Sequence, residues 1–223
     1  DVASTVANFG SFELTNSVWT YTLDQAQVQQ LDQGDQVTDT TTFTATDGSE
    51  QPVSVTITGT NDTPTVANAI ADQTATEDSA LSFQFDKGVF SDLDGDDTLS
   101  YTATRSDGSA LPSWLSFDAA ARTFSGKPAN DDVGTIDITV TATDGSAATA
   151  TDTFTLTVKN TDDIAVISGE TTGAVTEGNT GDKAVTASGT LTITDVDADD
   201  TPSFDDVAST VANFGSFELT NSV

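Results

Sequence analysis

Apolar and polar residues alternate along much of the chain, and Thr, Val, Ile and Phe dominate the alternating stretches. The clearest stretches are residues 42–48, 53–60, 135–145, 151–160 and 188–197. A period of two places one set of side chains on a buried face of a β-strand and the other set on its exposed face. These stretches are therefore predicted to be strands that are buried on one side.

Short turn sequences separate the predicted strands. DGS occurs at 47–49, 107–109 and 144–146, and DGD occurs at 94–96. Asp and Gly both suit turn geometry. Residues 23–33 favour at most a turn of helix, and no other stretch has a convincing helical pattern. Many short strands joined by turns predict an all-β chain of antiparallel sandwiches.

An identical internal repeat shows where the repeating unit of the sequence starts again. Residues 1–18 (DVASTVANFGSFELTNSV) recur unchanged as residues 206–223, a period of 205 residues (206 − 1). Surface positions of a folded protein tolerate exchange, so complete identity indicates a recent duplication. We therefore expect a tandem array, of which this chain is a window slightly longer than one unit.

Two similar connectors divide the repeating unit. GTNDTPTV at 59–66 and KNTDDIAV at 159–166 lie 100 residues apart (159 − 59), the length of one Ig-sized domain. We expect residues 61–160 to form a complete sandwich. Residues 161–223 should form the N-terminal portion of a second domain type, and residues 1–60 the C-terminal portion of that same type.

Two families of modules resemble this sequence. SDLDGDDTLSY (91–101) and LPSWLSFDAAARTFSGKPANDDVGTIDITVTATDGS (111–146) are similar to a dystroglycan-type cadherin-like domain. VTITGTNDTP (55–64) resembles the end of a VCBS repeat, and SGTLTITDVDADD (188–200) resembles the start of one. Such modules recur in giant secreted bacterial adhesins of the RTX type. The resemblance implies tandem Ig-like and cadherin-like β-sandwiches joined end to end, with Ca²⁺ at the junctions.

The charge of the chain narrows the range of partners. There are 36 acidic and six basic residues, a formal net charge of −30, and no Cys, His or Met. Nucleic acid and anionic membranes require basic patches, so we expect neither as a partner. No stretch approaches the ~20 apolar residues that cross a bilayer, so we expect no membrane insertion, and no signal peptide is visible. A solubility or halophilic surface would scatter its acids along strands, whereas these acids cluster in loops, which favours cation binding.

Ca²⁺ takes about six to eight oxygen ligands, which a junction between two sandwiches can pool from a linker and from neighbouring loops. The clustered acids resemble the cadherin arrangement, in which linker carboxylates, an early Glu, a DxD pair and a later Asp share ions. At the first junction the candidate ligands are Asn61, Asp62, Glu77, Asp92, Asp94 and Asp144. At the second junction they are Asp162, Asp163, Glu177, Asp195 and Asp197, with Asp47 as the copy of the late Asp that belongs to the preceding unit.

Each DxD pair also has a purely structural interpretation, because Asp readily caps its own backbone in a turn. The recurrence of a linker acid, an early Glu and a DxD pair at both junctions favours Ca²⁺ over that interpretation. Asp131 and Asp132 are weaker candidates, since a structural turn explains them equally well.

Catalysis has little support in the sequence. The absence of His and Cys removes the usual Ser/His and Cys/His nucleophile pairs. Composition alone leaves open a carboxylate pair of the glycosidase kind. Trp19 and Trp114 lie in apolar-periodic stretches, so we expect them to belong to cores rather than to sugar-binding platforms. We therefore expect that the chain is not an enzyme.

These features favour a structural function. We expect a Ca²⁺-stabilised extender repeat of a large secreted or cell-surface bacterial adhesin or extracellular fibre, which projects ligand-binding domains in cell adhesion and biofilm formation. The alternative is a carbohydrate- or peptide-binding adhesin module. The partners would be neighbouring repeats of the same polypeptide. Residues 164–223 of one molecule are also expected to complement residues 1–60 of the next, head to tail, through the split VCBS-like portions.

Overall fold

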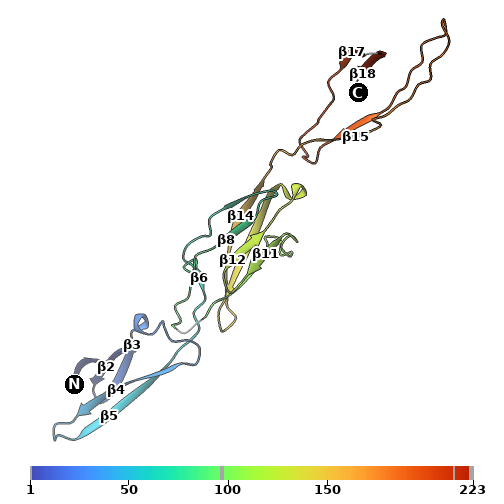
Figure 1. Ribbon diagram of the computed structural model, residues 1–223. Helices are drawn as coiled ribbons and strands as arrows, with labels where there is room; N and C mark the ends of the chain where they lie inside the picture. The colour runs from blue at the N-terminus through green and yellow to red at the C-terminus, as the bar shows by residue number, and fades with distance from the viewer. Residues whose placement is uncertain (1, 96–97, 213, 221–223) are drawn as a thin grey trace.

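A computed structural model describes residues 2–95, 98–212 and 214–220. The fold is all-β, as the sequence predicts, with two single-turn 3₁₀ helices as its helical elements in these ranges. Three bodies lie end to end in an elongated molecule, and each described sheet belongs to one body (Figure 1). No helix in the described part of the chain is long and apolar enough to cross a membrane.

The N-terminal body consists of a three-stranded sheet and a long hairpin. Phe12 is fully buried at its centre, with ring centroids 4.8 Å from Tyr21 and 6.4 Å from Trp19. The elements are β1 (Val2–Val6), β2 (Gly10–Thr15), β3 (Val18–Leu23), η1 (Gln25–Gln27), β4 (Gln36–Thr44) and β5 (Glu50–Thr58).

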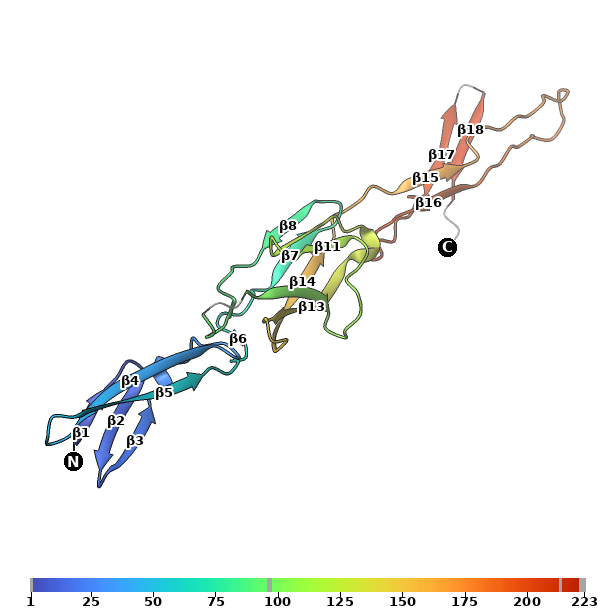
Figure 2. The same ribbon diagram turned by 90° about the horizontal axis from the view of Figure 1, so that it is seen from below.

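The middle body is a two-layer sandwich. One sheet has the strand order β10-β13-β14-β7 and the other the order β11-β12-β8, and β6 pairs separately with β9 (Figure 2). Phe124 of one sheet and Phe154 of the other meet edge to face in the core, with centroids 5.6 Å apart. The elements are β6 (Thr65–Val66), β7 (Gln73–Thr76), β8 (Leu81–Gln84), β9 (Phe90–Ser91), β10 (Ser100–Arg105), β11 (Leu115–Asp118), β12 (Thr123–Gly126), η2 (Asn130–Asp132), β13 (Gly134–Thr143) and β14 (Thr149–Lys159).

One strand pairing in the middle body is parallel. β7 runs alongside β14, with Thr76 opposite Lys159, and the Glu77 N–H donates to the Lys159 carbonyl oxygen at 3.0 Å. Because both strands run in the same direction, the residue after β7 lies where β14 leaves the body. This pairing carries Glu77 to the end of the sandwich that faces the C-terminal body.

The C-terminal body has two separate two-stranded sheets. In its described part no large hydrophobic side chain is buried, and Phe214 and Phe217 lie open to solvent. The elements are β15 (Val166–Gly169), β16 (Leu191–Thr194), β17 (Val207–Ala212) and β18 (Gly215–Leu219). The division of the chain into one complete and two partial domains, at residues 60 and 160, stays a prediction.

The two tryptophans differ in their environments. Trp114 is half-buried and packs against the core of the middle body, in agreement with its predicted role. Trp19 is 46% exposed, so the expectation of a core position is wrong for this residue. Its strand, β3, is an edge strand of the N-terminal sheet, and an edge strand lacks a neighbour on one side.

Asp39, in the middle of β4, is a buried acid that the strand pattern did not single out. Its carboxylate is fully buried and accepts hydrogen bonds from the Asn8 N–H (3.0 Å), the Phe9 N–H (2.9 Å) and the Tyr21 hydroxyl (2.6 Å). It therefore joins the β1–β2 turn, β3 and β4. Burial, together with the hydrogen bond to Asp39 and the charge of that carboxylate, raises the pKa of Tyr21 from 10.0 to about 12.

We predict that Asp39→Ala opens the β1–β2 hairpin locally. Three donors lose a charged acceptor, and such hydrogen bonds contribute about 1.5–3 kcal/mol each. A loss of about 3 kcal/mol corresponds to a rise of about 100-fold in amide exchange over residues 6–12, measured by hydrogen–deuterium exchange with mass spectrometry. Glu50→Ala removes an exposed acid from the same body and should leave exchange unchanged. Wild-type protection in Asp39→Ala would contradict this role.

We also predict a stability loss of the N-terminal body at alkaline pH. The folded pKa of Tyr21 is raised, so its contribution is complete below pH 10 and is lost as the pH rises from 10 to about 12. Tyr21→Phe should be less stable than wild type at neutral pH and should decline less steeply above pH 10. The difference in tyrosinate absorbance between the two proteins gives the pKa directly. A Tyr21 pKa near 10 would contradict the prediction.

Candidate metal centres at the two junctions

At the first junction, the linker between β5 and β6 meets residues 92–95, which follow β9. The Asp62 N–H donates to Asp94 Oδ2 at 2.7 Å, and the Asp94 N–H donates to Asp92 Oδ1 at 3.1 Å. Asp94 is 4% exposed. These bonds hold the linker acid and the DxD pair in one cluster.

The second junction repeats the same hydrogen bonds. The Asp163 N–H donates to Asp197 Oδ2 at 2.7 Å, and the Asp197 N–H donates to Asp195 Oδ1 at 3.0 Å. Asp197 is also 4% exposed. Two bodies with different sequences therefore use one local geometry to attach a linker acid to a DxD turn.

The late Asp of the first junction joins its cluster. Asp144 follows β13 and is buried; its Oδ1 accepts from the Ala148 N–H at 2.7 Å. Its Oδ2 accepts from Asn61 Nδ2 at 3.1 Å. The structure thus brings together Asn61, Asp62, Asp92, Asp94 and Asp144.

Glu77 lies at the second junction, so its predicted place at the first junction is wrong. Its Oε1 accepts from the Thr161 N–H in the second linker. Carboxylate oxygens of Glu77, Asp163 and Asp197 lie within 4.8 Å of one another. The reason is the parallel pairing of β7 with β14, which places an early residue of the sandwich at its far end.

Two further predicted ligands lie away from these clusters. Glu177 is exposed and belongs to the connection between β15 and β16, which extends away from the middle body (Figures 1 and 2). Its predicted place at the second junction is therefore wrong. Asp47 lies in the β4–β5 turn, where hydrogen bonds from the Ser49 hydroxyl (2.7 Å) and N–H (3.0 Å) hold the pKa of its carboxyl below the ordinary value. It lies in neither of the two acidic clusters, and the role of its copy as a ligand in the next unit stays a prediction.

Three residues join the junctions that sequence reasoning did not select. Asp32, from the N-terminal body, is near enough for its charge to act on Asp94, and the carbonyl of Gln30, two residues earlier, accepts from the Gly95 N–H at 3.2 Å. Asp200 lies within 4.8 Å of Asp162 and Asp197. The extra acid after the DVD pair was a sequence signal for Asp200, whereas Asp32 lies 30 residues before Asp62 (62 − 32) and had none.

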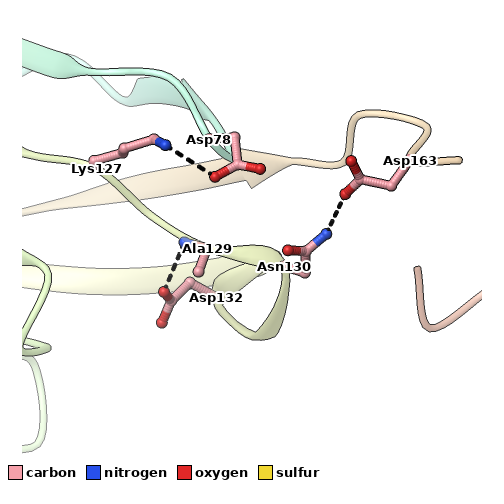
Figure 3. A network of polar contacts seen from close by, with 6 residues as sticks. All are labelled: Asp78, Lys127, Ala129, Asn130, Asp132 and Asp163. Atoms are coloured by element: carbon pink, nitrogen blue, oxygen red, sulfur yellow. Dashed lines mark hydrogen bonds and ion pairs between the residues drawn. The ribbon is translucent and has the colours of Figure 1, made fainter. Parts of the chain in front are cut away.

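The third of these residues is Asn130 in η2. Its Nδ2 donates to Asp163 Oδ2 at 2.6 Å across the second junction (Figure 3). Asp132, in the same turn, accepts from the Ala129 N–H at 2.9 Å and so caps the turn that positions Asn130. The weaker candidate NDD loop therefore contributes an amide to the junction, and Asp132 has the structural role considered for it.

Negative charge accumulates at both clusters. Burial raises the pKa of Asp94, and the carboxylates of Asp62, Asp92 and Asp32 raise it further, against the lowering effect of the Asp62 N–H. Desolvation and the neighbouring charges of Asp162, Asp195 and Asp197 raise the pKa of Asp200. The one salt bridge found among the described residues, Lys127–Asp78 at 3.1 Å, lies beside the second junction and is exposed (Figure 3).

Buried oxygens without a hydrogen-bond partner concentrate at the junctions. Within the described residues seven buried side-chain atoms lack such a partner, and five of them are junction oxygens. They are Asn61 Oδ1, Asp92 Oδ2, Asp94 Oδ1, Glu77 Oε2 and Asp197 Oδ1. Buried polar atoms are normally paired, so these oxygens are candidate ligands for a cation or for water. Carboxylate and amide oxygens are the donors that a hard divalent cation such as Ca²⁺ prefers.

Comparison with known proteins agrees with the fold. Residues 63–159 match the family model described as "Putative Ig domain". No curated protein matches the chain.

The similar solved structures include cadherin ectodomains. The protocadherin fragment PcdhgB3 EC1-4 aligns over 97% of this chain and 56% of its own, at 11% identity and a TM-score of 0.50. Human mucin-like protocadherin EC1-2 aligns over 71% of this chain and 81% of its own, at 15% identity and a TM-score of 0.47.

An endo-fucoidan hydrolase from glycoside hydrolase family 107 aligns over 72% of this chain at 18% identity and a TM-score of 0.37. The chain spans about a quarter of the length of the first solved structures that it matches (23%, 23% and 26%). The family match and the two-layer architecture together show that residues 63–159 have an Ig-like β-sandwich fold, and the protocadherin fragment is similar to the chain in fold.

Proposed function

We propose that the chain is a non-catalytic extender repeat of an extracellular adhesion protein, stiffened by Ca²⁺ at the junctions between its domains. The observation that carries this proposal is the set of buried, unpartnered carboxylate and amide oxygens at both junctions. At the second junction the set combines groups from two consecutive bodies, so an ion bound there would contact both. At the first junction it combines the linker with the middle body, and Asp32 of the N-terminal body lies near it.

Repulsion between the clustered carboxylates explains why a cation would stabilise the junctions. Two unit charges about 4 Å apart interact by roughly 4 kcal/mol at an effective dielectric constant near 20. Repulsion of this size between Glu77, Asp163 and Asp197 exceeds the ~1.5–3 kcal/mol of a hydrogen bond to a charged group. Without a countercharge the linker would move away from the acidic loops. A bound Ca²⁺ supplies that countercharge and draws the oxygens together.

The chain's own residues provide the two binding sets. At the first junction the donors are Asn61, Asp62, Asp92, Asp94 and Asp144, with Asp32 nearby from the preceding body. At the second junction they are Glu77, Asp162, Asp163, Asp195, Asp197 and Asp200. Since the middle body receives the chain at one end and releases it at the other (Figure 1), rigid junctions would convert a string of domains into a rod.

The parent protein that fits this role is a long bacterial adhesin of the RTX type, secreted or held at the cell surface and active in biofilm formation. The identical segments 1–18 and 206–223 and the VCBS resemblance support this proposal. In such an array, residues 161–223 followed by a copy of residues 19–60 would form a VCBS-like domain. Glu77 lies at the junction that follows its own domain. By analogy, Glu177 would lie at the junction that follows this VCBS-like domain.

Removal of Ca²⁺ should loosen the rod. A ligand at 100 times its dissociation constant stabilises a folded protein by about 2.7 kcal/mol per site. For a domain of this size we expect the melting temperature to be roughly 10 °C higher in millimolar Ca²⁺ than in excess EGTA. Small-angle X-ray scattering should show a longer and narrower distance distribution with Ca²⁺, and Mg²⁺ controls for ionic strength. Identical melting and scattering in Ca²⁺ and EGTA would refute the proposed function.

Glu77→Gln should weaken Ca²⁺ binding at the second junction and not at the first. The amide keeps an acceptor for the Thr161 N–H but removes one ligand charge, so we expect a loss of about tenfold or more in affinity. Hydrogen exchange should show reduced Ca²⁺-dependent protection at residues 195–200 and wild-type protection at 92–95. Asp107→Asn, in an exposed DGS turn, is the matched control. Lost protection at 92–95 with wild-type values at 195–200 would restore Glu77 to the first junction.

A further inference from the structure

One hairpin sequence occurs twice in the molecule with the same geometry. In β1–β2, Val2 lies opposite Leu14 and Thr5 opposite Phe12, with a register irregularity between the two pairs. In β17–β18, Val207 lies opposite Leu219 and Thr210 opposite Phe217, with the same irregularity. The repeated segment therefore forms the same hairpin at both ends of the chain, independently of its surroundings.

The two hairpins differ in what covers them. Phe12 is 0% exposed, whereas its copy Phe217 is 72% exposed. Phe9 packs against the cluster of Val28, Leu31 and Ile57, whereas its copy Phe214 is fully exposed. The N-terminal hairpin is covered because β3, β4 and β5 follow it, and the C-terminal hairpin has no such strands beside it in the described structure.

The surface that holds the N-terminal hairpin is formed by β3 and β4, and we refer to these two strands as the receptor. On β3, Tyr21 lies opposite Phe12 and Trp19 opposite Leu14. On β4, Asp39 accepts the two backbone N–H groups of the β1–β2 turn. All of these contacts are made by residues of the repeated segment, so an identical hairpin from another molecule fits the same receptor.

Exchange of one hairpin for its copy conserves these contacts. Other groups therefore decide whether the resident or the incoming hairpin occupies the receptor. The resident hairpin has the advantage of its tether, the tight Asn16-Ser17 turn with positive φ at both residues. The incoming hairpin brings β15–β16 with it. Val166 and Ile167 of β15 are 61% and 58% exposed, and Trp19 of the receptor is 46% exposed. Consecutive side chains of a strand point to opposite faces, so burial of one of these two residues against Trp19 would favour the exchange.

We propose that β17–β18 of one molecule replaces β1–β2 on the receptor of a second copy, so that residues 164–223 and the following molecule's residues 19–60 complete one sandwich. The contact is heterologous: each addition leaves a free hairpin at one end and a receptor at the other. Because these lie in opposite end bodies of an elongated molecule (Figures 1 and 2), the assembly grows as an open chain rather than a closed dimer. In a tandem array the same contact occurs within one polypeptide.

A matched pair of substitutions tests the exchange, because Phe12 and Phe217 have identical sequence neighbours but opposite roles. Phe217→Ala weakens the incoming hairpin, and Phe12→Ala weakens the resident competitor. Truncation of a buried Phe alters an equilibrium by about 100-fold or more. In sedimentation velocity over a concentration series, Phe217→Ala should lower the association constant by that factor and Phe12→Ala should raise it. Equal effects of the two substitutions, or a wild-type monomer at all concentrations, would overturn the proposal.

Disulfide trapping tests the register and does not depend on the stability of either Phe variant. Glu13 lies opposite Thr20 on β3, so its copy Glu218 should lie opposite Thr20 of the next molecule. The chain has no Cys, so Thr20→Cys with Glu218→Cys should form disulfide-linked ladders under oxidation. Thr20→Cys with Glu13→Cys should close within one chain. Thr20→Cys with Ser216→Cys, on the same face but two residues out of register, should trap little.

The trapping is done in Ca²⁺ and in EGTA, which separates this inference from the proposed cation sites. Ladders in both conditions would support exchange whatever the fate of the Ca²⁺ proposal. Absence of ladders from the Glu218 pair, or equal ladders from the Ser216 pair, would overturn the inference even if Ca²⁺ binds as proposed.

Discussion

Repulsion among carboxylates at the two junctions is the constraint on which the arrangement of the molecule depends. Each linker is attached to the following body mainly through hydrogen bonds to a DxD turn, from Asp62 to Asp94 and from Asp163 to Asp197. The same bonds gather acids whose charges oppose one another, and no basic residue in the described chain forms an ion pair with them. The geometry that orders the bodies is therefore the geometry that makes a cation favourable there.

The middle body supplies one half of each junction. Asp92, Asp94 and Asp144 lie at the end that receives the chain, and Glu77 and the η2 turn lie at the end that releases it. In the proposed array, a single sandwich with acids at both ends would let each copy complete the candidate sites of its neighbours. The contact between two bodies would then depend on residues of both, and no single domain would form it alone.

The end bodies show how much of a hairpin's environment comes from the strands beside it. The residues from 206 have the same sequence as those from position 1 and form the same backbone pairing, yet Phe12 is buried and Phe217 is not. Local sequence determines the hairpin because its turn and alternation are local. Burial depends on β3, β4 and Asp39, which only one copy has beside it.

The sequence by itself determined the all-β class, the position of most long strands and the association of each linker acid with its DxD pair, because alternation, turn residues and short-range spacing are local signals. It did not determine the position of Glu77, the burial of Asp39, the exposure of Trp19 or the contributions of Asp32 and Asn130. Each of these depends on which distant strands lie side by side. A parallel pairing such as β7 with β14 leaves no local mark in the sequence, yet it moves a carboxylate from one end of a domain to the other, and only the tertiary structure decides that.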